Sequence, residues 1–233
     1  MKISLWQRLL DLLAPRLCVV CGRRLSPTEQ VLCGGCHLKL PRTGFHRQPT
    51  DNIMARLFWG IIPVERAAAL FYYEGNSPTA NILYDLKYHD RPEIGVVMGR
   101  MIAREFIETD FFGGIDLIIP IPLARSRQRH RGYNQSMELA RGISQTTGLP
   151  IYNKVVRRSH FVKSQTQMGR QERQENVANV FQVKDLDAIR GRHVLLVDDV
   201  VTTGATMTAC ARELLKAEDI TISIVALGFA KSK

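Results

Sequence analysis

Short apolar segments alternate with segments of helical periodicity along most of the chain. The apolar segments have the length and composition of buried strands: Ala67–Tyr73, Asp116–Ile121, Ile151–Val156, His193–Val197 and Ile220–Gly228. Helical patterns lie between the later ones, around Asn134–Ser144 and Ala205–Lys216. This alternation predicts an α/β fold with a mostly parallel, twisted sheet flanked by helices on both faces.

Two further segments have the spacing of amphipathic helices. Asp90 is placed to cap and Pro92 to open a helix whose apolar residues recur at i+3 and i+4 steps: Ile94, Val97, Met98, Met101, Ile102 and Phe106. A shorter pattern ends before Pro15 and contains Trp6, Leu9, Leu10 and Leu13. We expect the first helix to face the core and the second to pack on its own domain.

Four of the five cysteines form two close pairs, in the array C-x2-C-x11-C-x2-C: Cys18, Cys21, Cys33 and Cys36. Paired turns of this spacing can present four thiolates tetrahedrally to one zinc ion. Four thiolates leave no open coordination position, so the zinc is expected to be structural. Direct contact of this module with nucleic acid is the alternative. Cys210 stands apart on a buried helical stripe, and we expect a core thiol there.

The positions of these features suggest how the 233 residues are divided. We expect residues 1–45 to hold the first helix and the four-cysteine zinc module. Residues 46–65 are rich in turn formers and are expected to connect it to residues 66–233, the main domain.

Charge and hydropathy restrict the partners and the location. The net charge is +10 and the sequence pI is about 9.7, which favours an anionic partner: DNA, RNA, a membrane surface or a polyphosphate metabolite. No apolar run approaches the roughly 20 residues that cross a bilayer, and Arg8 and Asp11 interrupt the opening segment. We therefore expect a cytoplasmic protein without a membrane span.

The segment VLLVDDVVTTGAT, residues 194–206, joins a buried strand to a helix. Ligands of parallel sheets bind beyond the carboxyl ends of the strands, where Asp198 and Asp199 are expected. Thr202 to Thr206 then surround a helix N-terminus, which favours a phosphate, and Gly204 permits close approach of the backbone. Carboxylates beside a phosphate site can accept hydrogen bonds from sugar hydroxyls, directly or through magnesium, so the segment predicts a ribose 5-phosphate unit.

Three other interpretations fit this segment less well. A Walker B strand ends similarly, but G-x-x-x-x-G-K-[ST] occurs nowhere in the chain. A dinucleotide-binding fold needs G-x-G-x-x-G after its first strand, and this is missing as well. A capped helix after an ordinary strand leaves two adjacent acids at the strand end unexplained.

The same segment resembles the signature of the type I phosphoribosyltransferases, which bind 5-phosphoribosyl-1-pyrophosphate (PRPP). The resemblance covers the chain from about Ala67 to the C-terminus. It implies that Asp198 and Asp199 hold the ribose hydroxyls and that the following loop surrounds the 5-phosphate. The implied PRPP site comprises Asp198, Asp199, Val200, Val201, Thr202, Thr203, Gly204, Ala205 and Thr206.

Nearly the whole chain resembles the ComF family, which includes competence protein F and GntX-like DNA-utilisation proteins. The shared features are the four-cysteine module before the phosphoribosyltransferase-like domain, HRGYNQ at His130–Gln135, and GRQERQEN, which ends at Asn176. The resemblance implies a role in DNA uptake during competence or in the use of DNA as a nutrient.

The family resemblance also implies sites for the rest of the ligand. The turn after Asp116–Ile121 is the expected pyrophosphate loop, with Leu123, Ala124 and Arg125. Several basic residues follow that can grip phosphate oxygens or form a nucleic-acid strip: Arg125, Arg127, Arg129, His130 and Arg131. The polar segment Arg157–Asn176 is expected to act as a lid, and Asp199 is a candidate general base.

Three functions remain open. The first is a phosphoribosyltransferase-domain protein that binds PRPP with magnesium. The second is a sensor or adaptor without turnover that docks on single-stranded DNA or a helicase-type partner. The third is a nucleotide-salvage enzyme, which needs aromatic residues that stack a nucleobase; Phe161 is almost the only candidate that the sequence offers.

Overall fold

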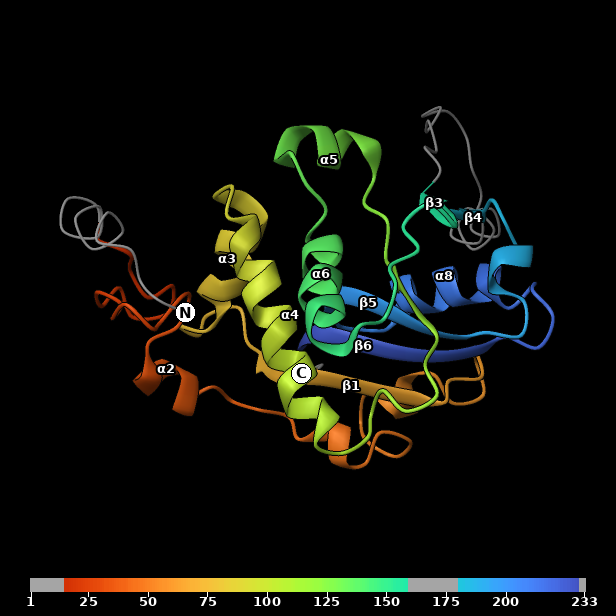
Figure 1. Ribbon diagram of the computed structural model, residues 1–233, viewed down its shortest axis with the longest axis horizontal. Helices are drawn as coiled ribbons and strands as arrows, with labels where there is room; N and C mark the ends of the chain where they lie inside the picture. The colour runs from red at the N-terminus through yellow and green to blue at the C-terminus, as the bar shows by residue number, and fades with distance from the viewer. Residues whose placement is uncertain (1–14, 159–179, 231–233) are drawn as a thin grey trace, which may run out of the picture.

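The computed structural model describes residues 15–158 and 180–230 (Figure 1). The predicted N-terminal helix, Phe161 and most of the predicted lid lie outside the described residues. Among the helices of the described chain, none combines the length and the apolarity that crossing a membrane requires.

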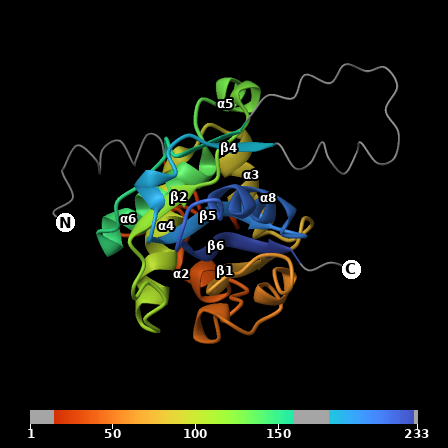
Figure 2. The same ribbon diagram turned by 90° about the vertical axis from the view of Figure 1, so that its right-hand side faces the viewer.

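One four-stranded parallel sheet forms the centre of the molecule, with the order β1–β6–β5–β2 (Figure 2). The strands are β1 (Arg66–Tyr73), β2 (Leu117–Pro120), β5 (His193–Val201) and β6 (Thr221–Ala230). The two central strands, β5 and β6, are buried over most of their length, as strands covered on both faces must be. The predicted α/β fold with a parallel sheet is confirmed.

The predicted strand Ile151–Val156 is wrong. Only Ile151 forms a bridge to β2, opposite Ile118, and the next three residues are exposed. Val156 instead opens β3 (Val156–Arg158), which pairs antiparallel with β4 (Phe181–Val183) outside the main sheet. The apolar residues of this segment pack without continuing the ladder, so apolarity alone misassigned them.

Helices cover both faces of the sheet (Figure 2). On one side lie α4 (Pro92–Ile107) and α6 (Gln135–Thr147), and on the other lies α8 (Ala205–Leu214). Glycines allow α4 and α6 to touch, because a Cβ at Gly99 would overlap the Leu139 carbonyl group. This close packing fixes the N-terminus of α6 beside the end of β5.

Two helices of the sheet domain were not predicted. The first is α3 (Ala80–Tyr88), whose buried residues include Ile82, Leu83 and Leu86. The second is α5 (Arg125–Arg131), which follows the turn after β2, has no buried residue and projects above α6 (Figure 1). The basic run therefore forms an exposed helix beside the carboxyl ends of the strands.

The chain before β1 packs against the sheet domain. It contains α2 (Gly34–Leu38) and the short 3-10 helices η1 (Phe45–Arg47) and η2 (Ala55–Leu57). Elsewhere in the chain, the 3-10 helix η3 (Asp187–Ile189) precedes β5. Met54 and Phe58 are fully buried, and Phe58 lies directly against Gly204. The cysteine module contacts α4 through the Arg42–Glu105 ion pair of 2.8 Å. The segment before β1 thus packs against the loop after β5.

Candidate functional site

The site forms where β5 continues beyond its neighbour β2. Pairing between these strands ends at Pro120 opposite Val197, whereas β5 stays paired with β6 as far as Val201. The predicted strand end at Val197 is therefore wrong, because pairing with β6 alone carries the ladder further. Asp198 and Asp199 lie within the strand, at the point where its β2 side becomes free.

Asp199 is buried and held by two partners. Its Oδ1 lies 3.2 Å from Lys87 Nζ, and its Oδ2 accepts a 2.8 Å hydrogen bond from Gln135 Nε2. Lys87 belongs to α3 and Gln135 is the first residue of α6. Asp199 is therefore a buried carboxylate whose two oxygens each have a partner, one cationic and one a hydrogen-bond donor.

Asp198 has a different environment. Its Oδ1 accepts hydrogen bonds from Ser136 Oγ, at 2.9 Å, and from the backbone N–H of Asp199, at 2.8 Å. Burial, reinforced by the charge of Asp199, raises the pKa of Asp198 to about 7. A carboxyl group with this pKa exchanges a proton near neutral pH.

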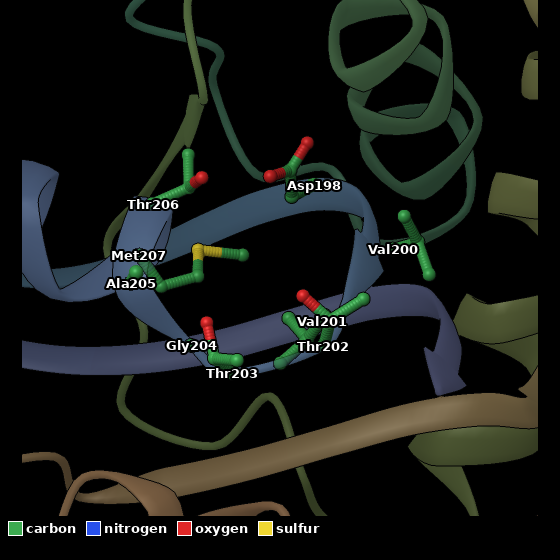
Figure 3. Close-up of a pocket in the computed structure, with 9 residues that line it drawn as sticks. All are labelled: Asp198, Val200, Val201, Thr202, Thr203, Gly204, Ala205, Thr206 and Met207. Atoms are coloured by element: carbon green, nitrogen blue, oxygen red, sulfur yellow. The ribbon is translucent and has the colours of Figure 1, made fainter. Parts of the chain in front are cut away.

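The loop after β5 encloses a small cavity of about 40 Å³ (Figure 3). Its lining comprises Asp198, Val200, Val201, Thr202, Thr203, Gly204, Ala205, Thr206 and Met207. Gly204 has a φ of 76° and is the N-cap of α8, without a capping side chain. The first backbone N–H groups of α8 have no acceptor within the helix and are available to an anion in this cavity.

A second cavity of about 300 Å³ adjoins the first. Four residues line both: Asp198, Val200, Thr202 and Thr206. The second is also lined by basic side chains: Lys87, Arg127, Arg131 and Arg158. Arg131 Nη1 and Gln135 Oε1 are buried and have no hydrogen-bond partner among the described residues. Unpaired buried polar atoms are costly, so these two atoms are suited to meet a polar ligand.

The expected pyrophosphate loop contributes to this cavity only in part. Leu123 lines the cavity, whereas Ala124 and Arg125 do not. Of the following basic residues, Arg127 and Arg131 line it, whereas Arg129 and His130 do not. The difference follows from α5, because a helix turns successive side chains in different directions.

Sequence reasoning missed Lys87, Tyr88, Ser136 and Arg158, all of which line the larger cavity. The unpredicted α3 carries the first two, and the apolar spacing of Ile82, Leu83 and Leu86 was the available signal for that helix. Tyr88 also corrects the expectation that Phe161 is almost the only aromatic candidate near the ligand.

The four predicted metal ligands come together in the N-terminal module. The sulfur atoms of Cys18, Cys21, Cys33 and Cys36 all lie within 4.8 Å of one another. Cys33 makes two hydrogen bonds within the cluster. Its Sγ caps α2 by accepting from the Cys36 N–H at 3.5 Å, and its own backbone N–H donates to Cys18 Sγ at 3.4 Å. Such N–H···S bonds orient thiolates toward a shared centre, and the cluster can hold a metal ion such as zinc.

Similar proteins carry names that agree with the predicted resemblance. DNA utilization protein YhgH of Shigella flexneri is 29% identical over 211 residues, which cover 89% of this chain and 88% of that protein. Competence protein F of Haemophilus influenzae is 26% identical, covering 85% of this chain and 90% of that protein. Competence protein ComFC of Bacillus subtilis is 32% identical over 43% of this chain and 38% of that protein. These matches confirm the resemblance to the ComF family.

Two solved structures are similar over part of the chain. Glutamine phosphoribosylpyrophosphate amidotransferase from B. subtilis matches with a TM-score of 0.41 and 19% identity, covering 60% of this chain and 30% of that one. An adenine phosphoribosyltransferase matches with a TM-score of 0.39 and 16% identity, covering 66% of this chain and 75% of that one. Residues 88–233 match the family model described as phosphoribosyl transferase domain, which is more than half of the chain. The chain therefore belongs to the phosphoribosyl transferase domain family.

Proposed function

We propose that the chain binds PRPP, together with magnesium, and acts in DNA uptake or DNA utilisation. The family supports the class of ligand, and the names of the YhgH and competence relatives support the biological role. The proposal assigns the ribose to Asp198 and Asp199 and the 5-phosphate to the loop from Thr202 to Thr206.

The observation that carries the proposal is the shared lining of two adjoining cavities. The small one lies at the uncapped N-terminus of α8 and suits a phosphate. The larger one is acidic on the β5 side and basic on the side of Arg127, Arg131 and Arg158. A ligand with a phosphate, a hydroxylated ring and a diphosphate matches this order of chemical groups.

The two buried atoms without hydrogen-bond partners among the described residues, Arg131 Nη1 and Gln135 Oε1, fit the same ligand. Gln135 Oε1 can accept from a ribose hydroxyl, because its Nε2 already donates to Asp199. Arg131 Nη1 can donate to a diphosphate oxygen, and a guanidinium can contact two such oxygens at once. Both atoms would gain the partner that they lack among the described residues.

Of the two acids, only Asp198 has a carboxylate oxygen that is free, among the described residues, to bind magnesium. Both oxygens of Asp199 are already engaged, by Lys87 and Gln135, so Asp198 and the oxygens of the ligand would supply the coordination. When bound, magnesium neutralises charge on the diphosphate leaving group. The ammonium group of Lys87 contacts Asp199 and adds a positive charge next to the two acids.

If turnover occurs, the reaction is a displacement of pyrophosphate at C1 of the ribose. The lone pair of the acceptor forms a bond to C1 of the ribose while the bond from C1 to the diphosphate oxygen breaks, and its electrons leave with pyrophosphate. The proton released by the acceptor passes to solvent water. No covalent intermediate with the protein is required.

Calorimetry with PRPP and magnesium tests the proposal on the wild type, Asp198→Asn and Thr206→Val. We expect binding by the wild type and a loss of about tenfold or more in each variant, since each removes a hydrogen-bonding group of the site. Asp187→Asn is the matched control, because Asp187 is exposed and lies in η3, away from both cavities. Absence of binding by the wild type would overturn the proposal.

Pyrophosphate release distinguishes the enzyme from the sensor. The wild type is incubated with PRPP, magnesium and a panel of nucleobases, amines and single-stranded DNA. Release that depends on one acceptor class, and that Asp198→Asn abolishes, supports a transferase. Binding without release under every acceptor supports a sensor or adaptor.

A further inference from the structure

The carboxylate of Glu29 connects the two cysteine pairs of the N-terminal module. Its Oε2 accepts a 2.7 Å hydrogen bond from the backbone N–H of Ser26, and its Oε1 accepts a 2.6 Å hydrogen bond from the backbone N–H of Gly34. Ser26 lies in the loop after Cys21, and Gly34 directly follows Cys33. The side chain therefore joins the loop between the pairs to the turn that carries the second pair.

The backbone of Glu29 is held in place as well. Its N–H donates to the Ser26 carbonyl at 3.1 Å, and its own carbonyl accepts from Arg16 Nη1 at 2.9 Å. Arg23 Nη2 lies 3.3 Å from Glu29 Oε1. Although the module is small, the Glu29 side chain is only 18% exposed. One residue thus contacts the segment before the first cysteine pair, the loop between the pairs and the second pair.

The hydrogen bond to Gly34 acts on the turn that orients the second cysteine pair. In this turn the Cys33 N–H donates to Cys18 Sγ, and the Cys36 N–H donates to Cys33 Sγ. The Gly34 N–H lies between these two donors in sequence, and as the first residue of α2 it has no acceptor within the helix. Glu29 supplies that acceptor, so it fixes the direction of the turn relative to the first pair.

We propose that Glu29 is a positioning residue for the metal centre, which holds the second cysteine pair against the first so that the four thiols converge before a metal ion binds. Both of its carboxylate oxygens accept from backbone N–H groups, so its role is to orient the ligands rather than to be one of them. The role requires a carboxylate, because a carboxylate accepts at both oxygens, whereas an amide of the same shape has one acceptor and one donor.

Titration of the full chain with cobalt(II) tests the inference, because the absorption of bound cobalt reports both the thiolates around the ion and their geometry. Zinc affinity is then measured by competition against cobalt. The chains compared are the wild type, Glu29→Gln, Glu105→Gln and Val31→Ala. Glu105→Gln is the matched control, because Glu105 joins the module to α4 through Arg42 rather than one cysteine pair to the other. Val31 is buried in the module, so Val31→Ala controls for a general loss of packing.

We expect Glu29→Gln to bind zinc about 10- to 100-fold more weakly than the wild type, the range typical for the loss of a group that orients metal ligands. Glu105→Gln should bind zinc as the wild type does. At saturating cobalt, the ligand-field bands of Glu29→Gln should shift, because its second cysteine pair is no longer held in the same orientation. Val31→Ala should keep the wild-type bands even where it binds metal more weakly.

Three results would overturn the inference. They are equal zinc affinity of Glu29→Gln and the wild type, ligand-field bands of Glu29→Gln that coincide with those of the wild type, and absence of metal binding by the wild type. The second of these would show that Glu29 contributes stability to the module without positioning its ligands.

The inference goes beyond the proposed function and does not depend on it. Glu29 lines neither cavity of the β5 site, so Glu29→Gln should bind PRPP as the wild type does in calorimetry. If the wild type fails to bind PRPP while zinc affinity still depends on Glu29, the positioning role stands and the proposed function falls. If PRPP binds while zinc affinity is insensitive to Glu29, the opposite holds.

Discussion

The cysteine module and the site at the end of β5 are assembled in opposite ways. The four cysteines lie between positions 18 and 36, and two short turns with α2 bring them together. The β5 site takes Lys87 from α3, Gln135 and Ser136 from α6, and its acids from β5. The first is local in sequence, and its four thiols can hold a metal ion. The second is distant in sequence and depends on the core.

This difference determines how each region fails. The module is short, so we expect a metal ion to supply much of its stability. The β5 site is surrounded by buried strands and helices, so its side chains are placed by packing that exists without any ligand. Removal of metal should therefore affect one region, and removal of a buried charge the other.

The largest expected effect is that of metal removal. We predict one zinc ion per chain and loss of it in Cys36→Ser, with local unfolding of the module, because zinc binding supplies about 10 kcal/mol in sites of this type. Elemental analysis measures the metal, and hydrogen exchange compares amides of residues 16–40 with those of β5 and β6. Protein purified without added metal that contains no zinc would contradict the assignment. Equal loss of protection in β6 would contradict the separation of the two regions.

The next effect concerns the buried charge of the β5 site. Lys87→Met leaves Asp199 without its cation, and we expect it to lower the free energy of unfolding by about 3 kcal/mol, because an unpaired buried charge is costly. Urea unfolding measures this loss. The double variant Lys87→Met with Asp199→Asn should recover part of it, since no charge then remains unpaired. Absence of recovery would indicate that Lys87 acts by packing alone.

The smallest effect is a pH dependence. The pKa of Asp198 in the folded chain is about 7, above the ordinary aspartate value, so the folded chain holds this proton more tightly than the unfolded chain does. Its contribution to stability is therefore present below about pH 4 and is lost as pH rises through 7. We expect Asp198→Asn to gain stability relative to the wild type as the pH rises from 4 to 8. A difference that does not change with pH would contradict the raised pKa.

Much of the architecture was predictable from local patterns. The parallel strands β1, β2, β5 and β6 and the helices α4, α6 and α8 all follow from apolar runs and helical periodicity. The errors in strand assignment occur where the apolar pattern of a segment does not match its hydrogen bonding to a neighbouring strand. The segment at Ile151 is apolar without joining the ladder, and β5 continues through two acids because β6 still pairs with it. Pairing depends on a neighbouring strand, which a local pattern does not describe.

The sequence by itself determined the four-cysteine array, the two acids followed by a turn into a helix, and the alternation that specifies a parallel sheet, because each depends on spacings within a few turns of the chain. Only the tertiary structure decided which partners meet those acids. Lys87 and Gln135 are far from Asp199 in sequence, and their approach requires α3 and α6 to pack at the end of β5. The same packing buries Asp198 beside the charge of Asp199, and this raises the pKa of Asp198 in a way that no local pattern reveals.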